Sequence, residues 1–185
     1  MKTLLAGIAL ASLIALPALA ALKEGAKAPE FTLPAALAGK DFIYDLASEL
    51  KKGPAVVYFY PKAFTSGCSA EAHEFAENMD NFKAMGATVI GVSGDNIGAL
   101  EKFSTASCGS KFPVAADPKG DVIAKYDVSL GLMGKALGMD HASNRTSFLV
   151  APDGTVLATY SALDASKHVS TMLDALKKYR ETHKA

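Results

Sequence analysis

The segment Ala55–Tyr60, AVVYFY, constrains the fold of this chain more than any other stretch. It is a continuous run of β-branched and aromatic residues, bounded by Gly53-Pro54 and by Pro61. Such a run is typical of a strand that is buried on both faces. A strand of that kind needs helices over both sides of its sheet, so the segment predicts an α/β protein.

Strands and helices alternate along the rest of the chain. Apolar residues spaced by three and four predict a helix that begins near Cys68 and stops at Gly86. Three glycines within residues 129–144 predict a loop there. The remaining expected elements are a strand or turn and short helix (40–50), a buried strand (87–93), a helix (96–111), an extended piece and short helix (112–128), a hairpin turning at Asp153-Gly154 (145–161) and a final helix (165–183). Together they predict one mixed α/β domain.

Residues 1–20 read as a secretory signal peptide. Lys2 precedes an apolar run from Leu4 to Leu16, then a Pro and small residues that suit cleavage after Ala20. The alternative is a membrane anchor, but the run is shorter than the roughly 20 residues that span a bilayer. We therefore expect residues 21–185 to form the single mature domain, exported to the periplasm, with no membrane attachment after cleavage.

The charge balance excludes some partners. Without residues 1–20 the chain carries 18 basic and 19 acidic residues, so nothing favours nucleic acid or an anionic membrane. The two cysteines, Cys68 and Cys108, are too few for a disulfide scaffold. In an oxidising compartment they could form one bond, perform redox chemistry, or do both.

Cys68 follows the best strand and falls at the start of a predicted helix. Unpaired N–H groups and the positive end of the helix dipole at such a place favour a thiolate over a thiol. Thr65 lies three residues earlier, close enough in a tight turn to hydrogen-bond the sulfur or an incoming oxygen. Pro61 can shield the pocket without adding an N–H group of its own.

Several thiol reactions are excluded by the residues near Cys68. Thioredoxin-type exchange needs Cys-x-x-Cys, but positions 65 and 71 are Thr and Glu. A copper-carrying Cys-x-x-x-Cys site would need a cysteine at Ala72, and no papain-like signature is present. A single thiolate with nearby donors suits attack on a peroxide O–O bond, whose transition state spreads negative charge over sulfur and oxygens.

The segment Pro61–Cys68, PKAFTSGC, resembles the Pro-x-x-x-Thr-x-x-Cys motif of peroxiredoxins. The flanking segments GAKAPEFTL, FPVAADPKGDVIAKYDV and RTSFLVAPDGTVLATY are similar to that family in the same order, so the resemblance covers nearly all of the mature chain. It is strongest to the bacterioferritin-comigratory, or Q-type, branch of the alkyl hydroperoxide reductase/thiol-specific antioxidant superfamily.

This resemblance implies a thioredoxin-like fold, with a central mixed sheet flanked by helices. It also implies a thiol peroxidase of antioxidant defence that reduces hydrogen peroxide and organic hydroperoxides without metal or organic cofactor. Cys68 would be the peroxidatic cysteine, Thr65 and Pro61 its pocket, and Arg145 the cation beside it, since an Arg fork stays charged and can hold sulfur and oxygen together. An external dithiol, a thioredoxin-like protein or a small thiol, would restore the enzyme, and we expect a monomer or weak dimer.

The sequence departs from the branch at one position. Many members carry a resolving cysteine five residues after the peroxidatic one, where this chain has His73. Cys108 is the remaining candidate, and three alternatives stay open: it resolves a Cys68 sulfenic acid as a disulfide, it is a bystander in a one-Cys enzyme, or it forms a permanent bond. A non-enzymatic redox-sensing or metal-carrying thiol module is the rival function. The four histidines have no spacing typical of a metal site.

Overall fold

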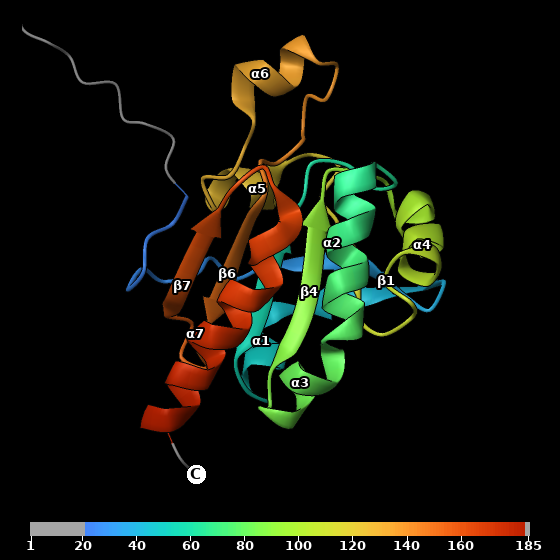
Figure 1. The fold of residues 1–185 in the computed structure, drawn as a ribbon. Coiled ribbons are helices and arrows are strands. Elements are labelled where there is room, and N and C mark those ends of the chain that lie inside the picture. The colour runs from blue at the N-terminus through green and yellow to red at the C-terminus, as the bar shows by residue number, and fades with distance from the viewer. Residues whose placement is uncertain (1–20, 184–185) are drawn as a thin grey trace, which may run out of the picture.

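The computed structural model describes residues 21–183 and arranges them around a seven-stranded sheet with the order β2-β1-β5-β4-β3-β6-β7 (Figure 1). Strands β3, β4 and β5 are parallel to one another, and the other neighbouring pairs are antiparallel. The predicted signal peptide, residues 1–20, lies outside the described residues. The strands are β1 (Thr32–Leu37), β2 (Lys40–Asp45), β3 (Ala55–Phe59), β4 (Thr88–Ser93), β5 (Val114–Ala116), β6 (Thr146–Val150) and β7 (Val156–Ser161).

Helices cover both faces of this sheet, which confirms the predicted thioredoxin-like architecture. In β3, Val56 and Tyr58 contribute to the core beneath α2, α4 and α7, while Val57 and Phe59 contribute to the core beneath α1 and α5. The alternation follows from the two-residue period of a strand. The helices are α1 (Leu46–Leu50), α2 (Ser66–Glu77), α3 (Met79–Ala84), α4 (Ile97–Ala106), α5 (Asp121–Lys125), α6 (Gly131–Ala136) and α7 (His168–Thr182).

Two expectations about helices need correction. The helix expected from Cys68 to Gly86 is divided into α2 and α3 at Asn78, whose side-chain amide donates to the Glu74 carbonyl oxygen at 2.9 Å and competes with the backbone there. The loop expected at residues 129–144 contains the short helix α6. A Cβ on Gly134 would lie 2.6 Å from the Met139 carbonyl oxygen, so this glycine permits the chain to fold back tightly after one turn.

Strand β1 was not expected, whereas the C-terminal hairpin and final helix are confirmed. The hairpin β6–β7 turns at Asp153-Gly154, with Gly154 at φ 81°. Within residues 21–183, none of the helices is both long enough and apolar enough to span a bilayer. In Figure 1, α6 projects from the same end of the molecule at which α2 begins.

Candidate active site

Cys68 lies in the first turn of α2, shortly after the interior strand β3, and its side chain is buried with 1% exposure. The connecting loop is strained, because Phe64 has φ 64°, a left-handed conformation that an aromatic residue rarely adopts. An edge-to-face contact with Phe103, at a centroid distance of 5.2 Å, holds the Phe64 ring. The strand-to-helix junction predicted for Cys68 is therefore confirmed.

Arg145 is brought to Cys68 by strand pairing. It directly precedes β6, and the antiparallel register places Thr146 opposite Phe59 at the end of β3. Arg145 is 6% exposed, and its Nη2 donates to the Cys68 sulfur at 3.4 Å. Its Nε donates to the Leu163 carbonyl oxygen at 3.0 Å, which fixes the plane of the guanidinium. The predicted cation thus lies beside the thiol.

Gly67 makes room for this contact. A Cβ at Gly67 would lie 3.2 Å from Arg145 Nη2, closer than an ordinary van der Waals contact. The residue before the cysteine therefore has to be small for the guanidinium to reach the sulfur.

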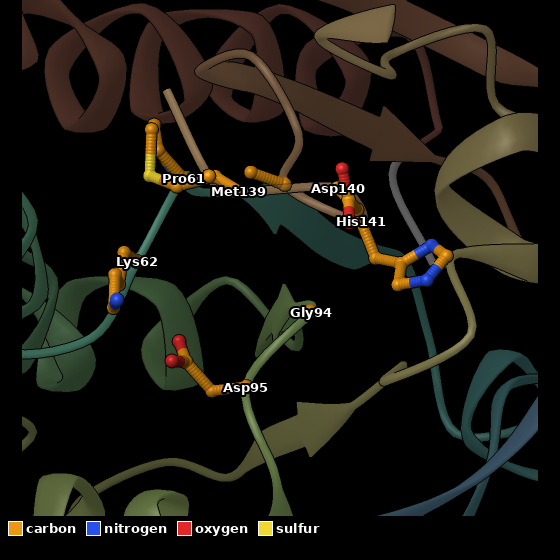
Figure 2. A pocket seen from close by; sticks show the side chains of 9 residues that line it. Pro61, Lys62, Gly94, Asp95, Met139, Asp140 and His141 are labelled. Atoms are coloured by element: carbon orange, nitrogen blue, oxygen red, sulfur yellow. The ribbon is translucent and has the colours of Figure 1, made fainter. Parts of the chain in front are cut away.

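Neither Thr65 nor Pro61 forms a hydrogen bond to the Cys68 sulfur. The Thr65 hydroxyl is exposed and donates to the Lys62 carbonyl oxygen at 3.0 Å, not to the sulfur. Its role toward a peroxide stays a prediction. Pro61 is partly buried and lines a cavity of about 210 Å³ with Asp95, Met139 and His141 among its other walls (Figure 2).

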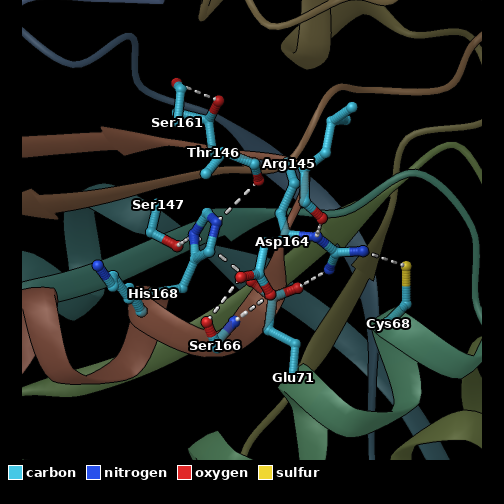
Figure 3. A network of polar contacts seen from close by, with 12 residues as sticks. Cys68, Glu71, Arg145, Thr146, Ser147, Ser161, Asp164, Ser166 and His168 are labelled. Atoms are coloured by element: carbon cyan, nitrogen blue, oxygen red, sulfur yellow. Dashed lines mark hydrogen bonds and ion pairs between the residues drawn. The ribbon is translucent and has the colours of Figure 1, made fainter.

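Glu71 is a site residue that sequence reasoning missed. It lies three residues after Cys68 on the same face of α2, is fully buried, and its Oε2 forms an ion pair with Arg145 Nη1 (Figure 3). Burial raises the pKa of Glu71 to about 7, although the Arg145 charge opposes that shift. An acidic residue on the apolar face of a predicted helix was the signal that could have identified it.

His168 is a second missed residue, since the sequence had grouped it with unrelated histidines. It begins α7, is fully buried, and has Nδ1 2.8 Å from the Ser147 hydroxyl and 3.6 Å from Glu71 Oε1. Burial lowers the pKa of His168 to about 4, against the hydrogen bond to the Ala162 carbonyl. His73, by contrast, is exposed and lies 3.3 Å from Glu77 Oε1, away from the thiol.

Cys108 lies just beyond α4 in an apolar environment and is fully buried. Burial raises the pKa of this thiol to about 12. The Ser107 hydroxyl donates to the Ser69 hydroxyl at 3.4 Å, so the segments that carry the two cysteines touch. Cys68 and Cys108 are both free thiols in this structure. Within residues 21–183, no group of three or more His, Cys, Asp or Glu residues is placed to hold a metal ion.

Comparison with known proteins agrees with this arrangement. The model of the AhpC/TSA family matches residues 25–159. Peroxiredoxin Bcp of Escherichia coli K12 is 31% identical over 160 residues, which cover 85% of this chain and 97% of that protein. A putative peroxiredoxin of Mycobacterium tuberculosis H37Rv is 31% identical over 153 residues, with 82% and 92% covered.

Solved structures give the same result. Peroxidoxin BcpB from Mycobacterium tuberculosis superposes with a TM-score of 0.77 at 30% identity, covering 86% of this chain and 99% of that one. A cysteine-to-serine mutant of Xylella fastidiosa PrxQ gives a TM-score of 0.74 at 26% identity, covering 86% and 98%. The chain therefore belongs to the AhpC/TSA family and is a peroxiredoxin, a thiol peroxidase similar to the Bcp and PrxQ proteins.

Proposed function

We propose that this peroxiredoxin reduces hydrogen peroxide and small organic hydroperoxides, with Cys68 as the peroxidatic residue. The observation that carries the proposal is the contact between Arg145 Nη2 and the Cys68 sulfur at 3.4 Å, at the N-terminal end of a helix. Both the guanidinium and the helix terminus stabilise negative charge on sulfur and on the oxygens of a bound peroxide. No cofactor is needed for this chemistry.

In the proposed reaction the Cys68 thiolate attacks one peroxide oxygen and the O–O bond breaks. The sulfur becomes a sulfenic acid, and the other oxygen leaves with a proton as water or an alcohol. Arg145 and the N–H groups at the start of α2 donate to the reacting oxygens, while Thr65 and Pro61 shape the entrance.

We assign the resolving step to Cys108. Its thiol would attack the sulfenic acid, form a Cys68–Cys108 disulfide and release water, after which an external dithiol reduces the bond. The contact between Ser107 and Ser69 supports the assignment because it keeps the two segments adjacent. Cys108 is buried, so the segment after α4 has to move before the sulfurs can meet. A one-Cys mechanism is the alternative.

Export to the periplasm, antioxidant defence, and a monomer or weak dimer complete the proposal. The apolar residues 4–16 behind Lys2 and before small residues support export. The physiological reductant is expected to be a thioredoxin-like protein or a small thiol, since either can reduce an accessible disulfide.

The test is to mix reduced residues 21–185 with hydrogen peroxide and follow thiol loss by rapid quench, alkylation and intact mass. The chain has no tryptophan, so mass is preferable to intrinsic fluorescence. We expect thiol loss at least about 10³-fold faster than for free cysteine, as positioned and polarised thiolates allow. Cys68→Ser should remove the fast phase, and Cys108→Ser should keep it but lose the disulfide.

Two outcomes would contradict the proposal. Thiol loss no faster than for free cysteine would remove the peroxidase function, and stoichiometric retention of copper or zinc would favour the metal-carrying module instead. If Cys108→Ser turned over as fast as the wild type with a dithiol, and peroxide-treated wild type held no intramolecular disulfide, the enzyme would be of the one-Cys kind.

A further inference from the structure

Behind Arg145 lies a buried polar cluster, formed by Glu71, Arg145, Ser147 and His168 (Figure 3). Its members come from α2, from the start of β6 and from the start of α7. Only Arg145 reaches the sulfur. The proposed peroxide chemistry uses Arg145 but gives no role to His168 or Ser147. Burying such polar groups is costly unless they are partnered, so their contacts bear on what they do.

The proton positions in the cluster follow from its contacts. His168 Nε2 lies 3.0 Å from the Ala162 carbonyl oxygen, which can only accept, so Nε2 carries a hydrogen. In a neutral ring Nδ1 then has a lone pair, which faces the Ser147 hydroxyl and Glu71 Oε1. Glu71 Oε1 is buried and has no hydrogen-bond donor among the described residues. The Ser147 hydroxyl, 2.8 Å away, donates to that lone pair, so Glu71 Oε1, 3.6 Å from Nδ1, is the atom left without a partner. A proton on Oε1 itself would remove this uncompensated buried charge.

The charge balance around Arg145 also favours a proton on Glu71. Arg145 carries one positive charge and contacts two acidic groups, the Cys68 thiol and the Glu71 carboxyl. If both were ionised, the buried site would hold one uncompensated negative charge, which is costly in a low-dielectric interior. A proton on Glu71 removes this excess and leaves Oε2 able to accept from Arg145.

We propose that, while Cys68 is a thiolate, Glu71 keeps a proton on Oε1 that faces His168 Nδ1. His168 is thus a positioning residue for the peroxidase reaction, because a neutral ring beside Oε1 favours the protonated carboxyl and leaves the charge of Arg145 to the sulfur. Ser147 competes with Glu71 for the same Nδ1 lone pair. The inference rests on the proposed function for its catalytic consequence, but not for the position of the proton itself.

Burial acts on both partners in the required direction. It raises the pKa of Glu71 and lowers that of His168, so the shared proton belongs to the carboxyl and not to the ring. The other titratable or charged groups facing the pair are Tyr58 on β3, Cys68 and Glu74 on α2, Tyr160 on β7 and Asp164 before α7.

The first test is infrared difference spectroscopy of the reduced protein across about pH 6 to 9, where the carbonyl stretch of a protonated carboxylic acid stands apart from carboxylate bands. We expect a band that disappears as the pH rises past about 7 and that Glu71→Gln removes. Glu77→Gln, at an exposed position of the same helix, is the matched control and should keep the band. No such band in the wild type, or a band that survives Glu71→Gln, would overturn the proposal.

The role of His168 is tested by the pH at which the band is lost. His168→Leu removes the acceptor, so the band should be lost at a midpoint about one pH unit lower than in the wild type. His168→Gln, whose amide oxygen can accept, should restore the wild-type midpoint. Ser147→Ala frees the Nδ1 lone pair for Glu71 and should move the loss higher. An unchanged midpoint in either His168→Leu, checked as folded by near-ultraviolet circular dichroism, or Ser147→Ala would overturn the assignment.

The catalytic consequence has its own readout. The rate constant of Cys68 with hydrogen peroxide should fall about tenfold as Glu71 ionises and competes for Arg145, the worth of one charge-assisted hydrogen bond. In Glu71→Gln the rate constant should not show this fall at high pH. A fall that persists in Glu71→Gln would overturn the coupling. Oxidation no faster than for free cysteine would instead contradict the proposed function, while the infrared result still decides where the proton lies.

Discussion

The two cysteines of this chain are equally buried, with 1% exposure at Cys68 and none at Cys108, but their surroundings differ. Cys68 lies at the N-terminal end of α2 in contact with a guanidinium, and a polar cluster stands behind that guanidinium. Cys108 lies among apolar residues, where burial raises the pKa of its thiol to about 12.

The difference shows that burial alone does not decide whether a thiol reacts. A thiolate needs compensation for its charge, and Arg145 together with the helix terminus supplies it at Cys68. No charged side chain is a hydrogen-bond partner of Cys108 in the described part of the chain, so the same chemical group there packs as part of the core.

The sharpest way to break this comparison is to label Cys108 alone. In reduced Cys68→Ser, a small neutral alkylating reagent at about pH 8 should modify Cys108 about 10³-fold more slowly than free cysteine, because so little of it is thiolate. The rate should rise about tenfold per pH unit up to about pH 11, measured by intact mass. Alkylation as fast as that of free cysteine would mean that the segment after α4 is already open.

Removing the guanidinium should make the reactivity of Cys68 more like that of Cys108. Arg145→Met is expected to slow peroxide oxidation about 10²-fold, since a charged donor to the reacting atoms is lost. Arg145→Lys should recover only part of this, because an ammonium lacks the planar fork that holds Leu163, Glu71 and the sulfur together. Arg180→Met, at an exposed position, is the control. A full rate in Arg145→Met would remove the arginine from the site.

The polar cluster should also be visible in the pH dependence of stability. Glu71, whose pKa is raised to about 7, contributes stability at low pH that is lost as the pH rises through about 7. His168, whose pKa is lowered to about 4, contributes stability above its unfolded pKa that is lost as the pH falls through about 4. Between about pH 4.5 and 6.5 the two groups therefore change the free energy of unfolding with pH in opposite directions.

Single variants should therefore expose one slope each. As the pH rises from about 4.5 to 6.5, the free energy of unfolding should fall by about 2 kcal/mol in His168→Gln, relative to the wild type. Over the same rise it should increase by about as much in Glu71→Gln. Urea unfolding at a series of pH values measures both. Parallel profiles in all three proteins would mean that the two groups do not titrate as a buried pair.

The smallest expected effect is at Gly67. Gly67→Ala puts a Cβ 3.2 Å from Arg145 Nη2, so the guanidinium has to shift by a few tenths of an ångström. Oxidation of Cys68 should slow about threefold, as small misplacements of positioned groups do. Gly98→Ala in α4, where the nearest atom outside the local backbone would be 3.6 Å away, should have no effect. A normal rate in Gly67→Ala would show that the contact tolerates displacement.

Local patterns in the sequence predicted much of the fold. The run Ala55–Tyr60 predicted the interior strand β3, and Asp153-Gly154 predicted the hairpin turn, because each depends on residues that are adjacent in the chain. The break at Asn78 and the helix α6 were missed, because a side-chain hydrogen bond and a close backbone approach decide them. Strand β1 was missed as well, since it is defined by pairing with β2 and β5.

The sequence by itself predicted Cys68 as the peroxidatic residue, since a cysteine without a nearby partner, between a buried strand and a helix start and after Pro61 and Thr65, favours thiolate chemistry. The motif and its flanks also indicated Arg145, although 77 positions separate it from Cys68. Only the tertiary structure decided which buried side chains surround the guanidinium of that arginine on the side away from Cys68. Glu71 and His168 are ordinary residues of two distant helices until the pairing of β6 with β3 and the packing of α7 against α2 bury them together. Burial is a property of the assembled core, so the pKa shifts of Glu71 and His168 cannot be predicted from sequence spacing alone.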